Sequence, residues 1–387
     1  MKSVIRMFSL LLVTGLAIQG CTEQSRSLEQ DAVREVSLPS ADGFQTSIHG
    51  VDTELYHLEA DGIRAAFTNY GARLVSLLVK DTNDQWIDMV LGFDNIEAYT
   101  QAGALYYGAT VGRYANRLDS GRFTIEGKPY QTPPNDGANS LHGGMAGLSQ
   151  QVWTVSEATN RSLSFTYVSP DGEMGFPGDL TTQVTYSIEG GPFLKIDYTA
   201  TTNKPTVINL THHSYFNLNG EGSGTIVDHL LQVPADSMLP VNRSLIPTGE
   251  IRAVEGTAFD FRDPVAFSNR IDADTGQVRI GRGYDHTLIL SMESSQAYHN
   301  AATVTGDKSK IQMTVLTTEP GIQVYSGNFM NGSLTGKGGN VYGFREGFCL
   351  ETQHFPDSPN HPDWPSTTLM PGVPFHSSTI YKFRIPR

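Results

Sequence analysis

Short strand-like runs, each ended by turn-forming residues, dominate this chain. Alternating or apolar stretches recur, separated by glycine, asparagine, aspartate or proline, and helical periodicity is scarce. The clearest runs are residues 73–79, 123–125, 152–155, 163–168, 182–188, 193–199, 310–317 and 380–385. Closely spaced strands with turn residues between them predict an all-β sandwich or barrel. The 39 glycines and 20 prolines fit that prediction, because both residue types favour turns between strands. We expect short helices at 96–100 and 264–271.

The N-terminus has the pattern of an export signal. Lys2 and Arg6 precede an apolar stretch, residues 7–18, that is too short for a typical membrane span. Residues 16–21, Leu-Ala-Ile-Gln-Gly-Cys, resemble the cleavage box of bacterial lipoproteins, in which the cysteine becomes the lipidated first residue. The alternative is an ordinary signal peptide with a cysteine nearby by chance. We therefore expect a signal peptide over 1–20 and a lipid on Cys21.

The segment after Cys21 predicts a tether and then one folded domain. Residues 22–40 are polar, carry both charge signs and contain few large apolar groups, which is typical of a flexible linker. We expect the β domain to span 41–387. Because Cys21 is used by the anchor, Cys349 has no partner and no structural disulfide is expected.

The charge balance excludes some partners. Cleavage would remove Lys2 and Arg6 from the 27 basic residues, which leaves 25 against 40 acidic residues. A chain with a net charge of about −15 is a poor partner for nucleic acid or for anionic lipid. We therefore expect membrane association only through the lipid on Cys21. By resemblance, Thr22 after Cys21 favours the outer membrane, facing the periplasm. We expect a monomer or a weak dimer.

The densest row of polar side chains lies in mid-chain, at the end of an apolar, β-branched run. Residues 207–217 read Val-Ile-Asn-Leu-Thr-His-His-Ser-Tyr-Phe-Asn. In a strand, His213 and Tyr215 would share one face and His212 and Ser214 the other. A histidine held in a cleft is suited to moving protons near neutral pH. The alternative is a polar strand end whose groups bond to one another.

Three other clusters could carry chemistry. Residues 112–118 hold two arginines, and residues 139–144 place His142 in a glycine-rich turn. In residues 347–357 an apolar strand delivers Glu351, with Gln353 on the same face; burial there would raise the pKa of Glu351, as a general base requires. Taken singly, each has a structural alternative: an ion-paired loop, an incidental histidine, or an acid paired with arginine.

Together these segments resemble the aldose 1-epimerase (galactose mutarotase) family, in the family's order, from about Tyr70 to Tyr381. The matching elements are Asn-Arg (116–117), Leu-His-Gly-Gly (141–144), residues 209–217, Tyr-Asp-His (284–286), Gln-Val-Tyr-Ser-Gly-Asn-Phe (323–329) and Leu-Glu-Thr-Gln (350–353). The resemblance implies a large antiparallel β-supersandwich. It also implies interconversion of the α and β anomers of free hexoses such as glucose and galactose, with no metal or organic cofactor.

The resemblance also implies roles for individual residues. Glu351 would be the base at the C1 hydroxyl and His213 the acid at the ring oxygen, with His142 bonding near that oxygen. Asn116 and Arg117 would bind sugar hydroxyls, Asp260 those farther from C1, and Gln323 would lie close to Glu351. Independently of the resemblance, we expect Tyr215 to stack on the sugar. The family more often has asparagine where this chain has His212, to which we assign a structural role.

Other functions remain open at this point. Asp260 and Glu351 could be the paired carboxylates of a glycoside hydrolase, if both flank the scissile bond. A sugar-binding envelope lipoprotein without catalysis would need hydroxyl partners but no acid–base pair. A sugar-phosphate epimerase would need a pocket richer in Arg and Lys than this acidic chain suggests.

Overall fold

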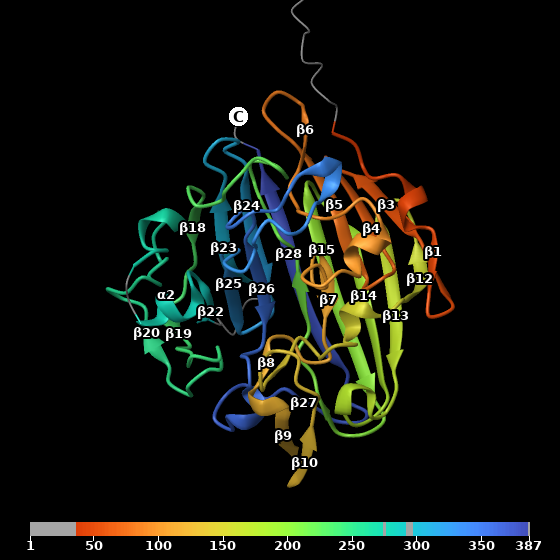
Figure 1. The fold of residues 1–387 in the computed structure, drawn as a ribbon, viewed down its shortest axis with the longest axis vertical. Helices are drawn as coiled ribbons and strands as arrows, with labels where there is room; N and C mark the ends of the chain where they lie inside the picture. The colour runs from red at the N-terminus through yellow and green to blue at the C-terminus, as the bar shows by residue number, and fades with distance from the viewer. Residues whose placement is uncertain (1–35, 274–275, 292–296, 386–387) are drawn as a thin grey trace, which may run out of the picture. The chain divides into compact units, whose positions relative to one another are not determined.

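The computed structural model describes residues 36–273, 276–291 and 297–385. The predicted signal peptide, Cys21 and most of the predicted tether lie outside these residues. The described part is almost entirely antiparallel β-structure (Figure 1). No helix within it is long and apolar enough to cross a membrane. The predicted all-β sandwich is confirmed.

The largest sheet has nine strands in the order β12–β13–β14–β15–β28–β24–β23–β18–β21, most of them side by side in Figure 1. Its strands are β12 (Thr154–Ala158), β13 (Ser162–Ser169), β14 (Leu180–Ile188), β15 (Phe193–Thr202), β28 (Phe375–Arg384), β24 (Gln312–Thr317), β23 (His299–Thr305), β18 (Leu230–Gln232) and β21 (Val265–Ala266). Buried and less buried residues alternate along β15, because one face packs on the core and the other does not.

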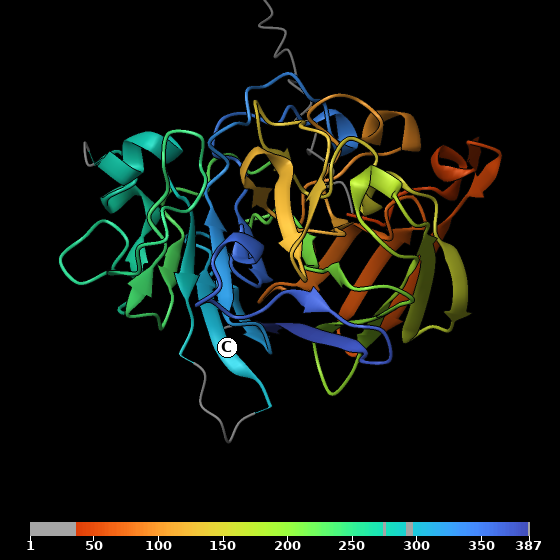
Figure 2. The same ribbon diagram turned by 90° about the horizontal axis from the view of Figure 1, so that it is seen from below.

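A four-stranded sheet packs against the β13–β14 end of the large sheet (Figure 2). It contains β3 (Leu55–Ala60), β4 (Ile63–Thr68), β5 (Arg73–Lys80) and β6 (Trp86–Asp88). The Phe67 ring lies 4.5 Å from the Tyr186 ring, and the Tyr56 ring lies 5.9 Å from the Phe165 ring, centroid to centroid. These contacts belong to one hydrophobic core that also includes Val184, and its burial is the main stabilising contribution to such a sandwich.

A five-stranded sheet and two strand pairs hold the residues singled out in the sequence. The sheet order is β20 (Arg252–Ala253), β19 (Ser237–Met238), β22 (Asp285–Ile289), β25 (Gly321–Tyr325) and β26 (Cys349–Gln353). The pairs are β7 (Ala109–Val111) with β17 (Thr211–His213), and β8 (Arg117–Leu118) with β11 (Ser140–Leu141). The Thr211 hydroxyl donates to the Thr352 carbonyl at 3.0 Å, which ties β17 to β26.

The remaining elements are short. Three further strand pairs are β1 (Thr46–Ile48) with β2 (Val51–Thr53), β9 (Arg122–Ile125) with β10 (Lys128–Gln131), and β16 (Thr206–Val207) with β27 (Thr368–Leu369). The α-helices are α1 (Ile96–Tyr99) and α2 (Gly276–Gly281), and the 3-10 turns are η1 (Ala41–Phe44), η2 (Asp119–Gly121), η3 (Leu148–Gln150), η4 (Glu173–Gly175), η5 (Phe267–Asn269), η6 (Lys337–Gly339) and η7 (Ser358–Asn360).

The expected helix at 96–100 is confirmed as α1, but the expected helix at 264–271 is wrong. That segment forms the edge strand β21 followed by the single turn η5. Val265 pairs with Leu231 of β18, and Phe267 is buried in the core, so tertiary contacts decide its conformation. The strand expected at 152–155 begins only at Thr154.

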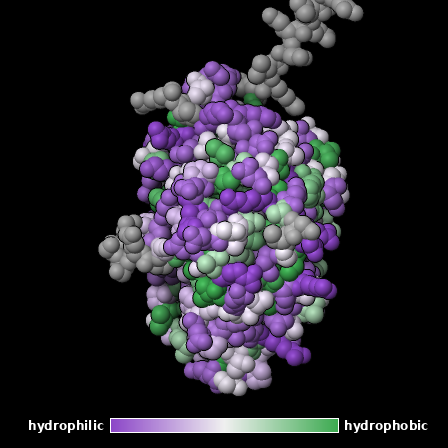
Figure 3. Space-filling model, turned by 90° about the vertical axis from the view of Figure 1, so that its left-hand side faces the viewer, coloured by the Kyte–Doolittle hydropathy of each residue, from purple (hydrophilic) through white to green (hydrophobic). Residues whose placement is uncertain are grey.

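One face of the molecule is drawn in space-filling form in Figure 3. Hydrophobic residues occur there in small groups among hydrophilic ones. Single exposed apolar side chains are normal for a folded protein and do not mark a docking surface.

Candidate active site

A single large cavity brings together most of the residues singled out in the sequence. Its volume is about 720 Å³, and its wall includes Asn116, Arg117, His142, His213, Asp285 and Glu351. These six side chains come from separate strands and loops, and all six residues are buried. Cavities of about 300–1,000 Å³ with a few convergent polar groups are typical of small-molecule sites.

Glu351 is placed at the cavity by strand register. It lies in the middle of β26, opposite Gln323 of β25, which in turn lies opposite Thr287 of β22. Glu351 and Gln353 are two residues apart and so share one face of β26, as the sequence predicted. Among the described residues, Oε2 of Glu351 has no hydrogen-bond partner. The carboxylate is therefore not fully used in internal hydrogen bonds.

His213 is held at the end of β17 between aromatic rings. Its imidazole stacks on Tyr215 at 5.1 Å and on Tyr106 at 5.8 Å, centroid to centroid. Nδ1 lies 3.5 Å from the Cys349 sulfur. His212 points the other way, and its Nδ1 lies 3.0 Å from the Ser214 hydroxyl. The predicted division of these side chains between the two strand faces is confirmed.

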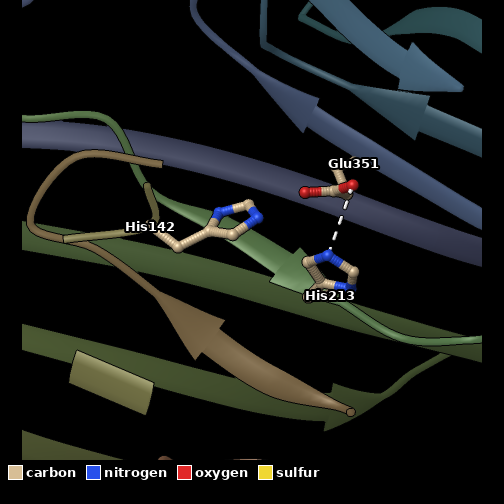
Figure 4. A group of neighbouring side chains, drawn as sticks. All are labelled: His142, His213 and Glu351. Atoms are coloured by element: carbon tan, nitrogen blue, oxygen red, sulfur yellow. Dashed lines mark ion pairs between the residues drawn. The ribbon is translucent and has the colours of Figure 1, made fainter. Parts of the chain in front are cut away.

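Glu351, His213 and His142 face one another across a few ångströms (Figure 4). Nε2 of His213 lies 3.6 Å from Oε1 of Glu351, which is an ion-pair distance and too long for a good hydrogen bond. The His142 and His213 rings meet edge to face, with centroids 5.1 Å apart. This geometry places a carboxylate and an imidazole on one small region of the cavity wall.

Burial shifts the pKa of both members of the pair, in opposite directions. It raises the pKa of Glu351 well above its ordinary value; the charge of Asp285 adds to the rise and Arg117 opposes it. Burial lowers the pKa of His213 to about 4. In water an imidazole holds a proton more tightly than a carboxylate does. Burial opposes this difference, because it lowers the pKa of His213 and raises the pKa of Glu351. A proton can therefore reside on either group, which suits a pair whose acid and base roles reverse.

His142 is fixed as a neutral hydrogen-bond donor. Burial, and then the nearby His213 and Arg117, lower its pKa well below the ordinary value. Its ring Nδ1 accepts the backbone N–H of Asn116 at 3.1 Å, and the backbone N–H of His142 donates to the Asn116 carbonyl at 2.9 Å. The proton of the neutral ring therefore sits on Nε2.

The same three side chains have the composition of a metal site. The ligand atoms of His142, His213 and Glu351 all lie within 4.8 Å of one another. A metal needs a lone pair from each imidazole, however, and Nε2 of His142 carries the proton while Asn116 bonds to Nδ1. The contact with Asn116 therefore favours a donor at this position over a metal ligand.

Arg117 connects two carboxylates of the wall. Its Nε donates to Asp136 at 2.7 Å, and Nη1 lies 3.8 Å from Asp285. Asn116, next to it, lines the cavity and accepts the Arg117 backbone N–H at 2.9 Å through its side-chain oxygen. The predicted placement of Asn116 and Arg117 at the site agrees with the structure.

Gln323 lies beside Glu351 in the strand register, as predicted, but it is not part of the cavity wall. Its Nε2 donates to Asp285 at 2.6 Å and its Oε1 accepts the Thr287 hydroxyl at 2.6 Å. Both ends of this amide are thus engaged by neighbouring strands. Gln323 holds the Asp285 carboxylate in place.

The structure does not bring Asp260 to the cavity wall. The predicted contact between Asp260 and the sugar hydroxyls is therefore wrong. The Asp260 carboxylate forms a bidentate ion pair with Arg262, through Nε and Nη2 at 2.9 Å each, and the described cavity wall does not include it. Asp285 occupies the wall instead. Arg262 lies only two positions after Asp260, which allows this local pairing, but the sequence pattern alone did not reveal it.

The structure adds residues that the sequence analysis missed. Asp285 was visible in the Tyr-Asp-His element, where an acid begins a strand, and Asp136 and Tyr106 lie in loops without a motif. Tyr215 lines the cavity, but its ring is stacked on Tyr107 at 3.9 Å as well as on His213. Tyr215 therefore supports His213. Because its ring is already stacked on two others, it is less available to stack on a sugar than we predicted.

The fold and the site define a β-sandwich protein with a buried acid–base pair in a small-molecule cavity. The chain belongs to the aldose 1-epimerase family, whose model matches residues 54–382. It is 43% identical to galactose mutarotase from Rattus norvegicus, covering 87% of this chain and 95% of the relative. It is 37% identical to aldose 1-epimerase from Escherichia coli K12, covering 83% and 92%.

Solved structures show the same relationship. The GalM/aldose epimerase homologue from C. elegans superimposes with a TM-score of 0.79 at 31% identity, covering 87% of this chain and all of that one. Galactose 1-epimerase from Lactobacillus acidophilus gives a TM-score of 0.76 at 29% identity, covering 88% and 97%. The predicted galactose mutarotase-like sandwich is therefore confirmed.

Proposed function

We propose that this protein is an aldose 1-epimerase (mutarotase), which interconverts the α and β anomers of free hexoses such as glucose and galactose. The observation that carries the proposal is the pair formed by Glu351 and His213, 3.6 Å apart in the cavity wall. The family membership and the named relatives support the same activity.

Ring opening needs two proton transfers, ring closure reverses them, and the enzyme ends the reaction unchanged. Glu351 takes the proton of the C1 hydroxyl while the His213 imidazolium gives a proton to the ring oxygen, and the C1–O5 bond breaks. The C1 aldehyde rotates, and reclosure from the other face returns both protons. The pair holds one proton before and after the cycle, so the roles reverse without an outside donor.

The other wall residues have supporting roles in this scheme. The fixed N–H on His142 donates toward the ring oxygen as negative charge develops there. Arg117 and Asp285, held by Asp136 and Gln323, are oriented to bond sugar hydroxyls. A site whose side chains are already held by neighbours loses little entropy when the sugar binds.

Three other functions are less well supported. Glycoside hydrolysis by Asp260 and Glu351 fails on geometry, because the Asp260 carboxylate is bound to Arg262 away from the described wall. A sugar binder would not need the acid–base pair. The phosphate group of a sugar phosphate would be repelled by the carboxylates of Glu351, Asp285 and Asp136, and the cavity wall has few cationic side chains to offset this repulsion.

Polarimetry tests the proposal. Freshly dissolved α-D-glucose and α-D-galactose should approach their equilibrium rotation faster with the purified protein, in proportion to its concentration. A rate equal to the spontaneous rate for every aldose tried would refute the activity.

The different places of Asp285 and Asp260 predict different effects for the same substitution at the two residues. Asp285→Asn removes a wall carboxylate that Arg117 and Gln323 position, and a lost hydrogen bond to a charged group costs about 1.5–3 kcal/mol. We expect kcat/KM for galactose to fall by about 10- to 100-fold. Asp260→Asn should change it by less than about twofold, because its partner is Arg262. Initial rates at several sugar concentrations would decide; a larger loss in Asp260→Asn would contradict the assignment.

We also propose that the enzyme is exported and lipid-anchored in the bacterial cell envelope, in the outer membrane facing the periplasm. The support is the signal-like segment 1–20 and the cysteine at position 21. With Cys21→Ser, we expect metabolic labelling by a fatty acid to stop while mutarotase activity persists. Labelling that continues in this variant would contradict the anchor.

A further inference from the structure

Three aromatic rings pack against one another in the cavity wall, and one of them belongs to a residue that takes no part in the proton transfers. The ring centroids of Tyr106 and His142 lie 4.6 Å apart, and those of Tyr106 and His213 lie 5.8 Å apart. The two histidine rings, with centroids 5.1 Å apart, complete the triangle. Tyr106 therefore contacts both histidines and also lines the cavity.

The plane of the His213 imidazole is set by two tyrosine rings. The rings of Tyr106 and Tyr215 are nearly parallel to it, at 25° and 26°. Rotation of the imidazole about χ2 would break both stacking contacts and would carry Nε2 away from Oε1 of Glu351. Tyr215 is in turn held by Tyr107, with ring centroids 3.9 Å apart. The orientation of the acid therefore depends on what holds Tyr106.

The turn that carries Tyr106 is held by a buried arginine. Arg73, at the start of β5, donates from Nη2 to the Leu105 carbonyl at 2.9 Å and from Nη1 to the Tyr107 carbonyl at 3.1 Å. Its Nε donates to the Tyr70 carbonyl at 2.9 Å, and the residue is fully buried. A buried guanidinium that loses such acceptors is left with unpaired donors, so these contacts are costly to break. The backbone on both sides of Tyr106 is therefore fixed to β5.

The same turn is also tied to the backbone of His213. The Gly108 N–H donates to the His213 carbonyl at 2.9 Å, and the Ala109 N–H donates to the Tyr106 carbonyl at 3.0 Å. Gly108 has a φ of +64°, and a Cβ at this position would lie 1.9 Å from the Leu74 carbonyl oxygen, so only glycine fits. Backbone hydrogen bonds thus fix the position of Tyr106 relative to His213.

The hydroxyl group of Tyr106 contributes little to this arrangement. Nδ2 of Asn135 lies 3.5 Å from it, which is longer than a usual N–H···O hydrogen bond. Burial, and then the charge of Asp136, raise the pKa of the phenol to about 12, although Arg117 opposes the rise, so the hydroxyl is protonated at neutral pH. The contacts with the two histidines are made by the ring.

From these contacts we infer that Tyr106 is a positioning residue for mutarotation, whose ring holds the His213 and His142 rings in the orientation that proton transfer to the sugar requires. This inference rests on the proposed mutarotase activity. A displacement of about 1 Å in a reacting group can lower a rate by about 10²-fold. Loss of the ring should therefore lower kcat and leave the affinity for the sugar nearly unchanged.

Substitutions that remove either the ring or only its hydroxyl test the inference. Tyr106→Leu and Tyr106→Met fill part of the same space without an aromatic plane. For both, we expect polarimetric kcat for galactose, per molecule shown by circular dichroism to be folded, to fall by about 10- to 100-fold. The Kd for galactose from calorimetry should change by less than about threefold. Tyr106→Phe keeps the ring and should retain kcat within about twofold.

Tyr130→Leu is the matched control. Tyr130 is also a partly buried tyrosine, and its ring stacks on Phe123 with centroids 5.5 Å apart, but it lies outside the described cavity wall, so kcat should not change. Three results would overturn the inference: an unchanged kcat in Tyr106→Leu and Tyr106→Met, a loss confined to Kd, or an equal loss in Tyr106→Phe. A wild-type protein that does not accelerate mutarotation would instead refute the activity itself.

Discussion

Replacing Glu351 by glutamine should abolish the acceleration of mutarotation, because the amide cannot accept the proton of the C1 hydroxyl. The substitution keeps the size of the side chain and its hydrogen-bonding oxygen, so the sugar should still bind. Loss of a general base typically lowers a rate by about 10²- to 10⁴-fold. Polarimetric kcat and the Kd for galactose from calorimetry would separate the two effects.

Glu319→Gln is a matched control for this variant. Glu319 is also a buried carboxylate, but it accepts from Nδ1 of His354 at 2.6 Å and lies outside the described cavity wall. We expect near-normal kcat per folded molecule. A fully active Glu351→Gln, or an equally damaged Glu319→Gln, would show that Glu351 is not the base.

His213→Gln should cause the second large loss, again about 10²- to 10⁴-fold in kcat, since glutamine cannot protonate the ring oxygen. The approximate size of the side chain is retained between Tyr106 and Tyr215. Initial polarimetric rates at saturating galactose would measure the effect, with circular dichroism to show that the variant is folded.

The adjacent histidine offers the control. His212 is buried on the opposite face of β17, between the rings of Tyr186 and Tyr381, and contacts Ser214. His212→Gln should lower the free energy of unfolding by leaving a less well packed core, with kcat per folded molecule within a few-fold of wild type. If His212→Gln loses as much activity as His213→Gln, the division of roles between the two faces is wrong.

Local pattern was sufficient to predict much of this fold. Alternation along 182–188 and 193–199 predicted β14 and β15 because each strand buries one face, and the turn residues between them marked their ends. The same period of two placed His213 with Tyr215 and Glu351 with Gln353. These predictions succeed because they depend on strand geometry alone.

The predictions failed where a contact that the sequence pattern does not show sets the conformation of a segment or the partner of a side chain. Residues 264–271 have the composition of a short helix, but Val265 completes the sheet edge beside Leu231. Asp260 and Asp285 are both acids in motif-like segments; only the three-dimensional structure shows that Arg262 binds the first and that Gln323 and Arg117 hold the second at the cavity. The sequence pattern does not show that Asp260 pairs with Arg262, or that Arg117 of β8 meets Asp285 of β22.

Exchange spectroscopy by proton NMR would test the central claim most directly, because it observes the two anomers interconverting at equilibrium. With α- and β-galactose at their equilibrium ratio, we predict exchange cross-peaks between the two H1 resonances that grow with protein concentration and disappear with Glu351→Gln. No new resonances should form. Cross-peaks that do not depend on the protein, or that persist with Glu351→Gln, would contradict the proposed acid–base pair.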